Sequence, residues 1–250
     1  MIEGININKK FADRVVLENV NVSFDKGKTN LIIGQSGMGK TVLVKCLVGL
    51  IEPDTGVVRF DGRPFSKMSY SEMKQIRQEI GMLFQGGALF DSMTAVENVM
   101  FPLTMFTAMT YEEKLERANW CLSRVNLVNV NKMLPSELSG GMKKRVALAR
   151  AIALNPKYLF CDEPNSGLDP VTACLIDELI GEITHESDIT TVVVTHDISS
   201  VLKTGEKIYF MYDGRITWQG DRNNILQTDS PELQNFVFAS ELTRRLKPRQ

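Results

Sequence analysis

The stretch Gly34-Gln35-Ser36-Gly37-Met38-Gly39-Lys40-Thr41 decides how the chain is interpreted, because it joins a short apolar run to a helical pattern. Leu31-Ile32-Ile33 precedes it and predicts a buried strand, and the pattern from Val42 to Leu50 predicts a helix. The three glycines let backbone N–H groups turn inward around an anion, and the positive end of the helix favours a phosphate. We expect Lys40 to reach the β- and γ-phosphates of a nucleotide and the Thr41 hydroxyl to bind Mg²⁺.

The composition is that of an ordinary globular protein. The chain has 250 residues, 43% of them hydrophobic and 24% charged, and a formal net charge of −1. So small a charge gives no broad basic field and argues against nucleic acid as a partner. No run approaches the roughly 18 apolar residues of a spanning helix, and Met1-Ile2-Glu3 does not begin a signal peptide. We expect a cytoplasmic protein that reaches a membrane only through a partner.

Four cysteines occur without Cys-x-x-Cys spacing. We expect buried free thiols in a reducing compartment rather than zinc ligands or disulfides. The residues are Cys46, Cys121, Cys161 and Cys174.

An acidic pair ends a second apolar run. Tyr158 to Cys161 predicts a buried strand, and Asp162-Glu163 follows where ligands bind in α/β sheets. Asp162 would help to hold Mg²⁺, and Glu163 would act as the general base or orient the water that attacks the γ-phosphate. Acidic pairs at strand ends are common, so the pair alone is a weak indication of a nucleotide site. It becomes informative because the chain also contains the phosphate loop.

Leu138-Ser139-Gly140-Gly141-Met142 marks the start of another helix, after the break at Pro135. Ser139 is a good N-cap, and the exposed N–H groups and the helix dipole favour an anion. An ordinary cap does not explain two glycines at the first helical positions, because glycine there lowers helix stability.

Taken in order, these motifs resemble those of the ABC transporter ATPase family, and the resemblance covers nearly the whole chain. It implies that Gln85, after the strand Ile80 to Phe84, contacts Mg²⁺ and the attacking water. It also implies that Ser166-Gly167-Leu168-Asp169 lines a dimer seam and that His196 senses the γ-phosphate. The implied nucleotide contacts are Phe11 and Val16 at the adenine, Gly34, Gln35, Ser36, Gly37, Met38, Gly39, Lys40, Thr41 and Val42, together with Gln85, Ser139, Gly140, Gly141 and Asp169.

The implied fold is an α/β P-loop NTPase with a RecA-like mixed sheet and flanking helices. Residues 1–86 and 154–228 would form this core together with an N-terminal antiparallel β-subdomain, which the alternation of Ile5, Ile7, Val16, Val20, Val22 and Phe24 also predicts. Residues 87–153 would form an inserted helical subdomain, and residues 229–250 a helical tail. Asp213-Gly214 predicts a hairpin turn between two late strands.

The resemblance also implies a mechanism. Ser139-Gly140-Gly141 would complete the ATP site of a second copy of the chain, so that two ATP molecules lie between two subunits related by a two-fold axis. Glu163→Gln is then expected to bind ATP, stay dimeric and barely hydrolyse. The family usually has Gln where this chain has Met142, and we expect no loss of ATPase activity from that difference.

The segment from residue 86 to 109 allows two interpretations. It carries no charge between Asn98 and Tyr111 but many Met and Phe side chains. These residues either form the core of the helical subdomain or line a groove near residues 86–106 that receives a helix of a membrane permease.

Gln-Gly-Gly-Ala-Leu-Phe-Asp-Ser-Met-Thr at 85–94, with the loop at 34–41 and the Leu-Ser-Gly-Gly-Met variant, resembles the ATPase of Mla-type phospholipid transporters. That resemblance implies phospholipid cargo, an integral permease and an Mce-type lipid-binding protein at the inner membrane. The basic C-terminal end, with Arg244, Arg245, Lys247 and Arg249, either contacts a partner or is a solvated tail.

Four rival classes remain. The first is an ABC ATPase of an importer or exporter for another cargo, which would share the general motifs of the nucleotide site. DNA-repair relatives insert long coiled coils between the phosphate loop and the second glycine motif, and this chain shows no sustained heptads there. Ribosome-acting relatives carry two cassettes in one chain, and a non-catalytic subunit would not need Lys40, Glu163 and His196 together.

Overall fold

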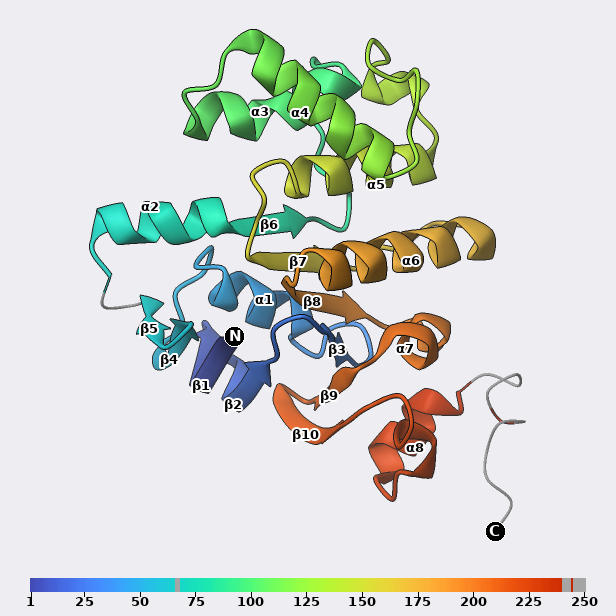
Figure 1. The fold of residues 1–250 in the computed structure, drawn as a ribbon. Coiled ribbons are helices and arrows are strands. Elements are labelled where there is room, and N and C mark those ends of the chain that lie inside the picture. Colours follow the sequence, from blue (N-terminus) through green and yellow to red (C-terminus); the bar gives the residue numbers. More distant parts are fainter. Residues whose placement is uncertain (66–67, 240–243, 245–250) are drawn as a thin grey trace. The chain divides into compact units, whose positions relative to one another are not determined.

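The computed structural model describes residues 1–65, 68–239 and 244, which belong to two compact units. Unit 1 comprises Met1–Tyr70 and Thr190–Gln250, and unit 2 comprises Ser71–Ile189. Figure 1 follows the chain through both. The subdomain boundaries expected at residues 86 and 153 stay a prediction.

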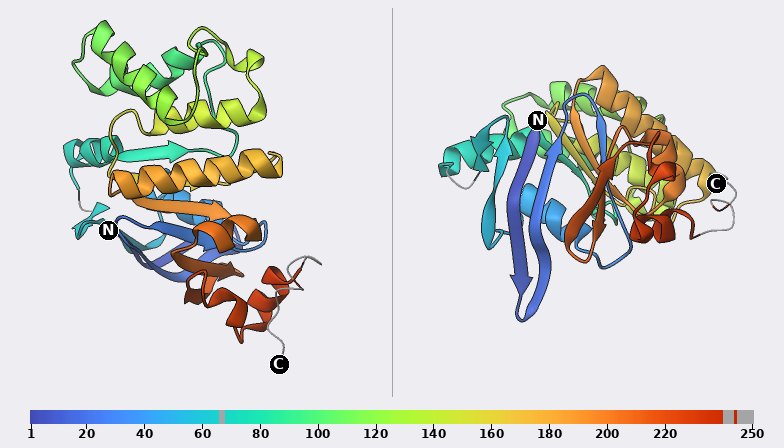
Figure 2. Two further views of the ribbon diagram at one scale, coloured as in Figure 1. Left: turned by 45° about the vertical axis from the view of Figure 1, so that its right-hand side comes forward. Right: turned by 90° about the horizontal axis from the view of Figure 1, so that it is seen from below.

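Unit 1 begins with an antiparallel sheet in the order β2-β1-β4-β5. Strands β1 and β2 form the long hairpin seen in the right-hand view of Figure 2. Ile7 and Val20 face each other in this pair, and both side chains are buried. The predicted antiparallel sheet is confirmed, but its burial does not alternate strictly, because register shifts interrupt the pairing of β1 with β2 and Leu17 is buried instead of Val16. Its strands are β1 (Ile2–Phe11), β2 (Arg14–Phe24), β4 (Thr55–Phe60) and β5 (Arg63–Pro64).

A second set of strands in unit 1 carries the phosphate loop. Strand β3 (Thr29–Ile33) pairs in parallel with both β8 (Thr190–Thr195) and β9 (Lys207–Tyr212). Every residue of β3 and β8 is buried, as expected for parallel strands covered on both faces. Strand β10 (Arg215–Gly220) returns antiparallel to β9 through the turn at Asp213-Gly214, where both residues have positive φ, so the predicted hairpin is confirmed. The helices of unit 1 are α1 (Lys40–Leu47), α7 (Ile198–Thr204), α8 (Pro231–Val237) and the short η3 (Ile225–Gln227).

Unit 2 combines one pair of parallel strands with helices. Strand β6 (Ile80–Leu83) pairs with β7 (Tyr158–Asp162), with Leu83 opposite Cys161. Helix α3 packs against α4 and α5, and the capping boxes of Thr94 with Glu97 and of Thr110 with Glu113 begin the first two of these helices. The helices are α2 (Tyr70–Glu79), α3 (Ala95–Phe106), α4 (Tyr111–Arg124), η2 (Pro135–Glu137), α5 (Gly140–Ala151) and α6 (Pro170–Glu186).

The four cysteines match the expectation from the sequence at all positions but one. Three cysteines are buried and free as expected, and burial raises the pKa of Cys46 and of Cys121 to about 11. Cys174 also forms no disulfide, but its side chain is exposed on α6, so the expected burial of this thiol is wrong.

The predicted helical tail is described only in part. Helix α8 ends at Val237, and Arg245, Lys247 and Arg249 lie outside the described residues. In the described part of the chain, no helix has the length and apolar character needed to cross a bilayer.

Candidate functional site

The phosphate loop in unit 1 has the backbone conformation that its glycines predict. Gly34, Gly37 and Gly39 have φ values of 148°, 83° and 98°. A Cβ on Gly39 would lie 2.7 Å from the carbonyl oxygen of Val16, so both the conformation and the space require glycine. No side chain among the described residues caps α1 at Gly39. The first N–H groups of this helix are therefore suited to an anion.

Lys40 is the first residue of α1, and its ammonium is held by the loop itself. The Nζ donates to the carbonyl oxygens of Gly34 and Gln35, at 2.8 Å in each case. The side chain is buried, while Gln35 and Ser36 are exposed at the loop surface. This donor set of backbone amides, a helix N-terminus and one positioned cation fits the phosphates of a nucleotide.

Two other predicted nucleotide contacts lie at strand ends of unit 1. Thr195 pairs with Ile33, so His196 leaves β8 at the sheet edge where β3 leads into Gly34. His196 is exposed, and the Thr195 hydroxyl accepts a hydrogen bond from the Asp197 amide. Phe11, at the end of β1, is 45% exposed with the Lys9 ammonium 5.5 Å from its ring centroid.

The acidic pair of unit 2 lies at the end of β7, as the sequence predicts. Asp162 and Glu163 are 5% and 8% exposed. Glu163 has a φ of 49°, a left-handed conformation that costs energy for a residue with a Cβ. Its carbonyl accepts from the Ser166 amide at 3.2 Å, which starts the turn leading to Asp169. Strain of this kind persists only where the surroundings hold it, and it is common at functional sites.

Gln85 follows β6, and one lysine connects its main chain to that of Glu163. The Lys144 Nζ donates to the carbonyl oxygen of Gln85, and also to that of Glu163 at 3.3 Å. Burial lowers the pKa of Lys144, and the nearby Cys161, Asp162 and Glu163 oppose that shift.

The Ser-Gly-Gly motif forms the helix start that was predicted. The Ser139 hydroxyl accepts from the Met142 amide at 3.2 Å. A Cβ on Gly141 would collide with the Thr172 side chain. Thr172 in turn donates its hydroxyl and its amide to Asp169, the N-cap of α6, and these bonds lower the pKa of Asp169 from its ordinary value. The second glycine therefore lets α5 approach the start of α6 closely.

Sequence reasoning missed Lys144 and Thr172. The spacing of Lys144 gave a usable signal, because the buried Gly141 and Leu148 lie three residues before it and four residues after it on α5. Thr172 gave none, since its role depends on a glycine of another helix.

Comparison with known proteins agrees with these motifs. The family model described as ABC transporter matches residues 17–166, more than half of the chain. The chain belongs to the ABC transporter family.

Two relatives and one solved structure show how far the similarity reaches. The chain is 37% identical to the intermembrane phospholipid transport system ATP-binding protein MlaF of Haemophilus influenzae, over 95% of this chain and 90% of that protein. It is 36% identical to the probable ribonucleotide transport ATP-binding protein mkl of Mycobacterium bovis, over 94% of this chain and 66% of that protein.

The solved structure is a dimeric ATP-binding cassette in a post-hydrolysis state, bound to ADP and Pi. It matches with a TM-score of 0.81 and 34% identity, over 89% of this chain and 99% of that one. The predicted P-loop NTPase fold is thereby confirmed. The protein is an ABC ATPase subunit that uses ATP.

Proposed function

We propose that this chain powers phospholipid transport through a separate integral permease, at the cytoplasmic face of an inner membrane and together with an Mce-type lipid-binding protein. The observation that carries the proposal is the similarity to a phospholipid transport ATPase along nearly the full length of both chains. Cargo is the part that most needs a test, because a relative of similar identity is named for ribonucleotide transport.

The site residues take their proposed roles from chemistry and position. The amides of residues 34–41 and the Lys40 ammonium bind the phosphates, while Phe11 and Val16 contact the adenine. Thr41, Gln85 and Asp162 supply the oxygen ligands that Mg²⁺ prefers. When bound, Mg²⁺ would neutralise charge that develops on the phosphate oxygens.

The remaining residues act on the attacking water and on the subunit interface. Glu163 orients the water and takes its proton, and His196 contacts the γ-phosphate. Ser139, Gly140 and Gly141 bind the nucleotide of the second copy from the start of α5, and Asp169 lines the seam between copies. Closure of the two copies on ATP and opening after hydrolysis would supply the motion that the permease uses.

A groove in unit 2 suits the docking of a permease helix. Its volume is about 280 Å³, and it is lined from β6, α3 and α5. Phe90 and Phe101 pack at its wall with ring centroids 4.6 Å apart. Arg150 fixes the rim by donating to the carbonyl oxygens of Gly87 and Ala88.

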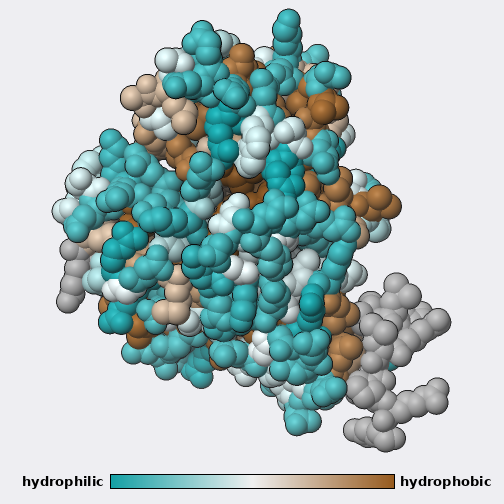
Figure 3. Space-filling view, viewed as in Figure 1, coloured by the Kyte–Doolittle hydropathy of each residue, from teal (hydrophilic) through white to brown (hydrophobic). Residues whose placement is uncertain are grey.

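Exposed apolar side chains belong to the groove lining and follow it in the sequence. Met105, Phe106 and Met109 are exposed at the end of α3 and just after it. Figure 3 shows tan and brown surface among the teal side chains where α3 and α4 lie. An amphipathic helix with an apolar face fits such a surface, and flexible Met side chains adapt to its shape.

The test is reconstitution of the chain with its permease in proteoliposomes, with lipid transfer and ATP hydrolysis measured together. Labelled phospholipid should move in an ATP-dependent way and stimulate hydrolysis, while ribonucleotides should do neither. Phe106→Glu should abolish the stimulation but not the basal hydrolysis, and Tyr111→Glu, an exposed aromatic outside the groove lining, should leave both unchanged. Stimulation by ribonucleotides but not by phospholipid would contradict the proposal.

A further inference from the structure

A buried lysine of unit 2 donates hydrogen bonds to the main chain of two proposed site residues. Lys144 lies on α5, which begins after Ser139, and it is 6% exposed. Removing an ammonium from water costs several kcal/mol unless its donors are paired. An apolar side chain at this position would avoid that desolvation cost. The position of the charge therefore needs a reason other than packing.

The partners of Lys144 suggest that reason. Its Nζ donates to the main-chain oxygens of Gln85 and Glu163. These residues follow two neighbouring parallel strands, and each lies two positions beyond the paired residues Leu83 and Cys161. One ammonium thus connects the ends of β6 and β7 to the helix that carries Ser139-Gly140-Gly141.

Tethering a carbonyl restricts the backbone on both sides of it. For Glu163 this matters, because its φ of 49° is unfavourable and is maintained by surrounding contacts. A residue that orients an attacking water must be held closely, since a misplacement of about 1 Å can cost about 100-fold in rate.

We propose that Lys144 is a positioning residue for ATP hydrolysis, which fixes Gln85 and Glu163 relative to each other and to the start of α5 through their main-chain carbonyls. This inference rests on the proposed function, which gives Gln85 and Glu163 their roles. It adds that α5, whose start is proposed to face the nucleotide of the second copy, also holds Gln85 and Glu163 of its own chain in position.

The decisive variant is Lys144→Met, which keeps the length of the side chain and removes the donors. We expect kcat for ATP hydrolysis to fall by about 10- to 100-fold. KM for ATP should stay within about threefold, because Lys144 does not belong to the phosphate loop. Lys144→Arg keeps donors at the same place and should recover most of the lost kcat.

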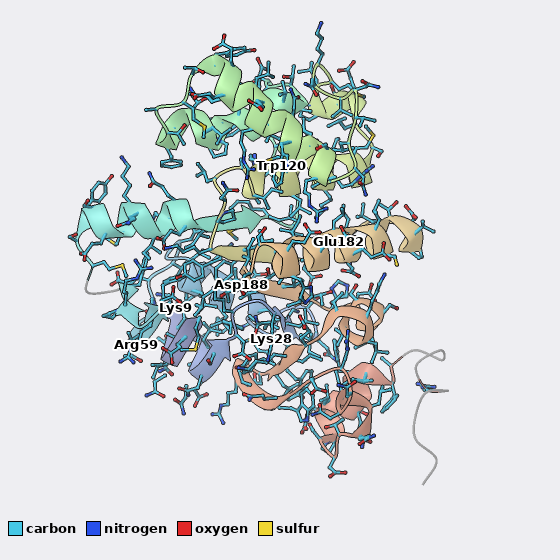
Figure 4. The ribbon with its side chains drawn as sticks, viewed as in Figure 1. Lys9, Lys28, Arg59, Trp120, Glu182 and Asp188 are labelled. Atoms are coloured by element: carbon cyan, nitrogen blue, oxygen red, sulfur yellow. The ribbon has the colours of Figure 1, made fainter. Side chains whose placement is uncertain are left out.

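The matched control is Arg117→Met on α4. Arg117 donates to the carbonyl oxygens of Ile152 and Ala153, at 3.0 and 2.9 Å, just beyond the other end of α5. It also stacks on Trp120, which is labelled on α4 in Figure 4. This change removes a tether of the same chemical kind without touching Gln85 or Glu163, so it should lower Tm and leave kcat unchanged.

All variants are measured in the complex with the permease, with Tm recorded beside kcat and KM. The inference is supported if only Lys144→Met loses kcat and Lys144→Arg regains it. It is overturned if kcat of Lys144→Met lies within threefold of that of Arg117→Met, or if KM rises while kcat holds. If Lys144→Met does not fold, Lys144→Arg decides: retained kcat supports the inference, and a folded Arg variant with more than a tenfold loss overturns it. Failure of the proposed function would give a different result. In that case the wild-type complex would not hydrolyse ATP, or the Glu163→Gln complex would hydrolyse ATP as fast as the wild type.

Discussion

Replacing Asn98 should destabilise the protein far more than its small size suggests. Its side chain is 0% exposed and makes four hydrogen bonds. The oxygen accepts from the Phe90 amide at 2.8 Å, and the nitrogen donates to the carbonyl oxygens of Phe90, Met93 and Thr94 at 3.1, 3.0 and 3.1 Å. One amide therefore holds the loop before α3 against the helix.

The magnitude follows from these bonds. The amide nitrogen has two hydrogens, which are shared among three carbonyl oxygens, so at about 1 kcal/mol net for each full hydrogen bond Asn98→Ala removes about 3 kcal/mol. Buried groups that are left without a partner add to this loss. Phe90 is partly exposed, so water can satisfy some of the groups left behind, and we expect about 2 to 4 kcal/mol of lost stability. For a chain of this size the loss corresponds to a fall in Tm of roughly 5 to 15 °C.

Urea unfolding followed by circular dichroism measures this loss. Asn98→Asp is the sharper variant, because it keeps the acceptor for the Phe90 amide but places a buried negative charge against three carbonyl oxygens. It should be less stable than Asn98→Ala at pH 7. The control Asn119→Ala removes an exposed amide that accepts one bond from Asn131, and should cost less than about 0.5 kcal/mol. A loss for Asn98→Ala no larger than that of the control, or an Asp variant more stable than the Ala variant, would refute the reasoning.

Three further predictions concern the nucleotide site. Lys40→Met should fold normally but bind ATP at least about tenfold more weakly, because it removes the positioned cation of the loop. Calorimetry measures this affinity, and an unchanged value would contradict the role given to Lys40. Met142→Gln should keep hydrolysis within about threefold in a phosphate-release assay, because the Met142 amide bonded to Ser139 is present in either residue; greatly raised or abolished turnover would show that the side chain itself matters. Asp169→Asn should lower the unfolding midpoint at pH 7. Hydrogen bonds from Thr172 lower the folded pKa of Asp169, so the difference from wild type should shrink as the pH falls through that folded pKa and the carboxylate loses its charge. A difference independent of pH between 7 and 2 would contradict this.

Much of the fold was predictable because local signals were complete. The start of helix α6 is marked in the sequence, because Pro170 is its first residue and the Asp169 side chain caps it. Parallel strands β3, β7 and β8 were recognisable as uncharged apolar runs closed by a glycine or by functional residues.

The rest depended on tertiary packing that a pattern does not encode. The left-handed backbone of Glu163 is maintained by its neighbours, while the residue type itself disfavours it. The spacing of Lys144 along α5 is compatible with burial, but its partners, the carbonyl oxygens of Gln85 and Glu163, come from two other segments and do not follow from any local pattern. The prediction for Cys174 was wrong in the opposite sense: cysteine is usually buried, and no local pattern indicated that this position on α6 is exposed.

The mass of Glu163→Gln in solution, measured by light scattering with and without Mg-ATP, tests the central claim most directly. If the phosphate loop of one copy and the Ser139-Gly140-Gly141 helix start of another enclose one nucleotide, the variant is a monomer alone and a stable dimer with ATP. Adding Lys40→Met to the same chain should return it to a monomer. A variant that binds ATP at full affinity and yet keeps the mass of a single chain would contradict the account.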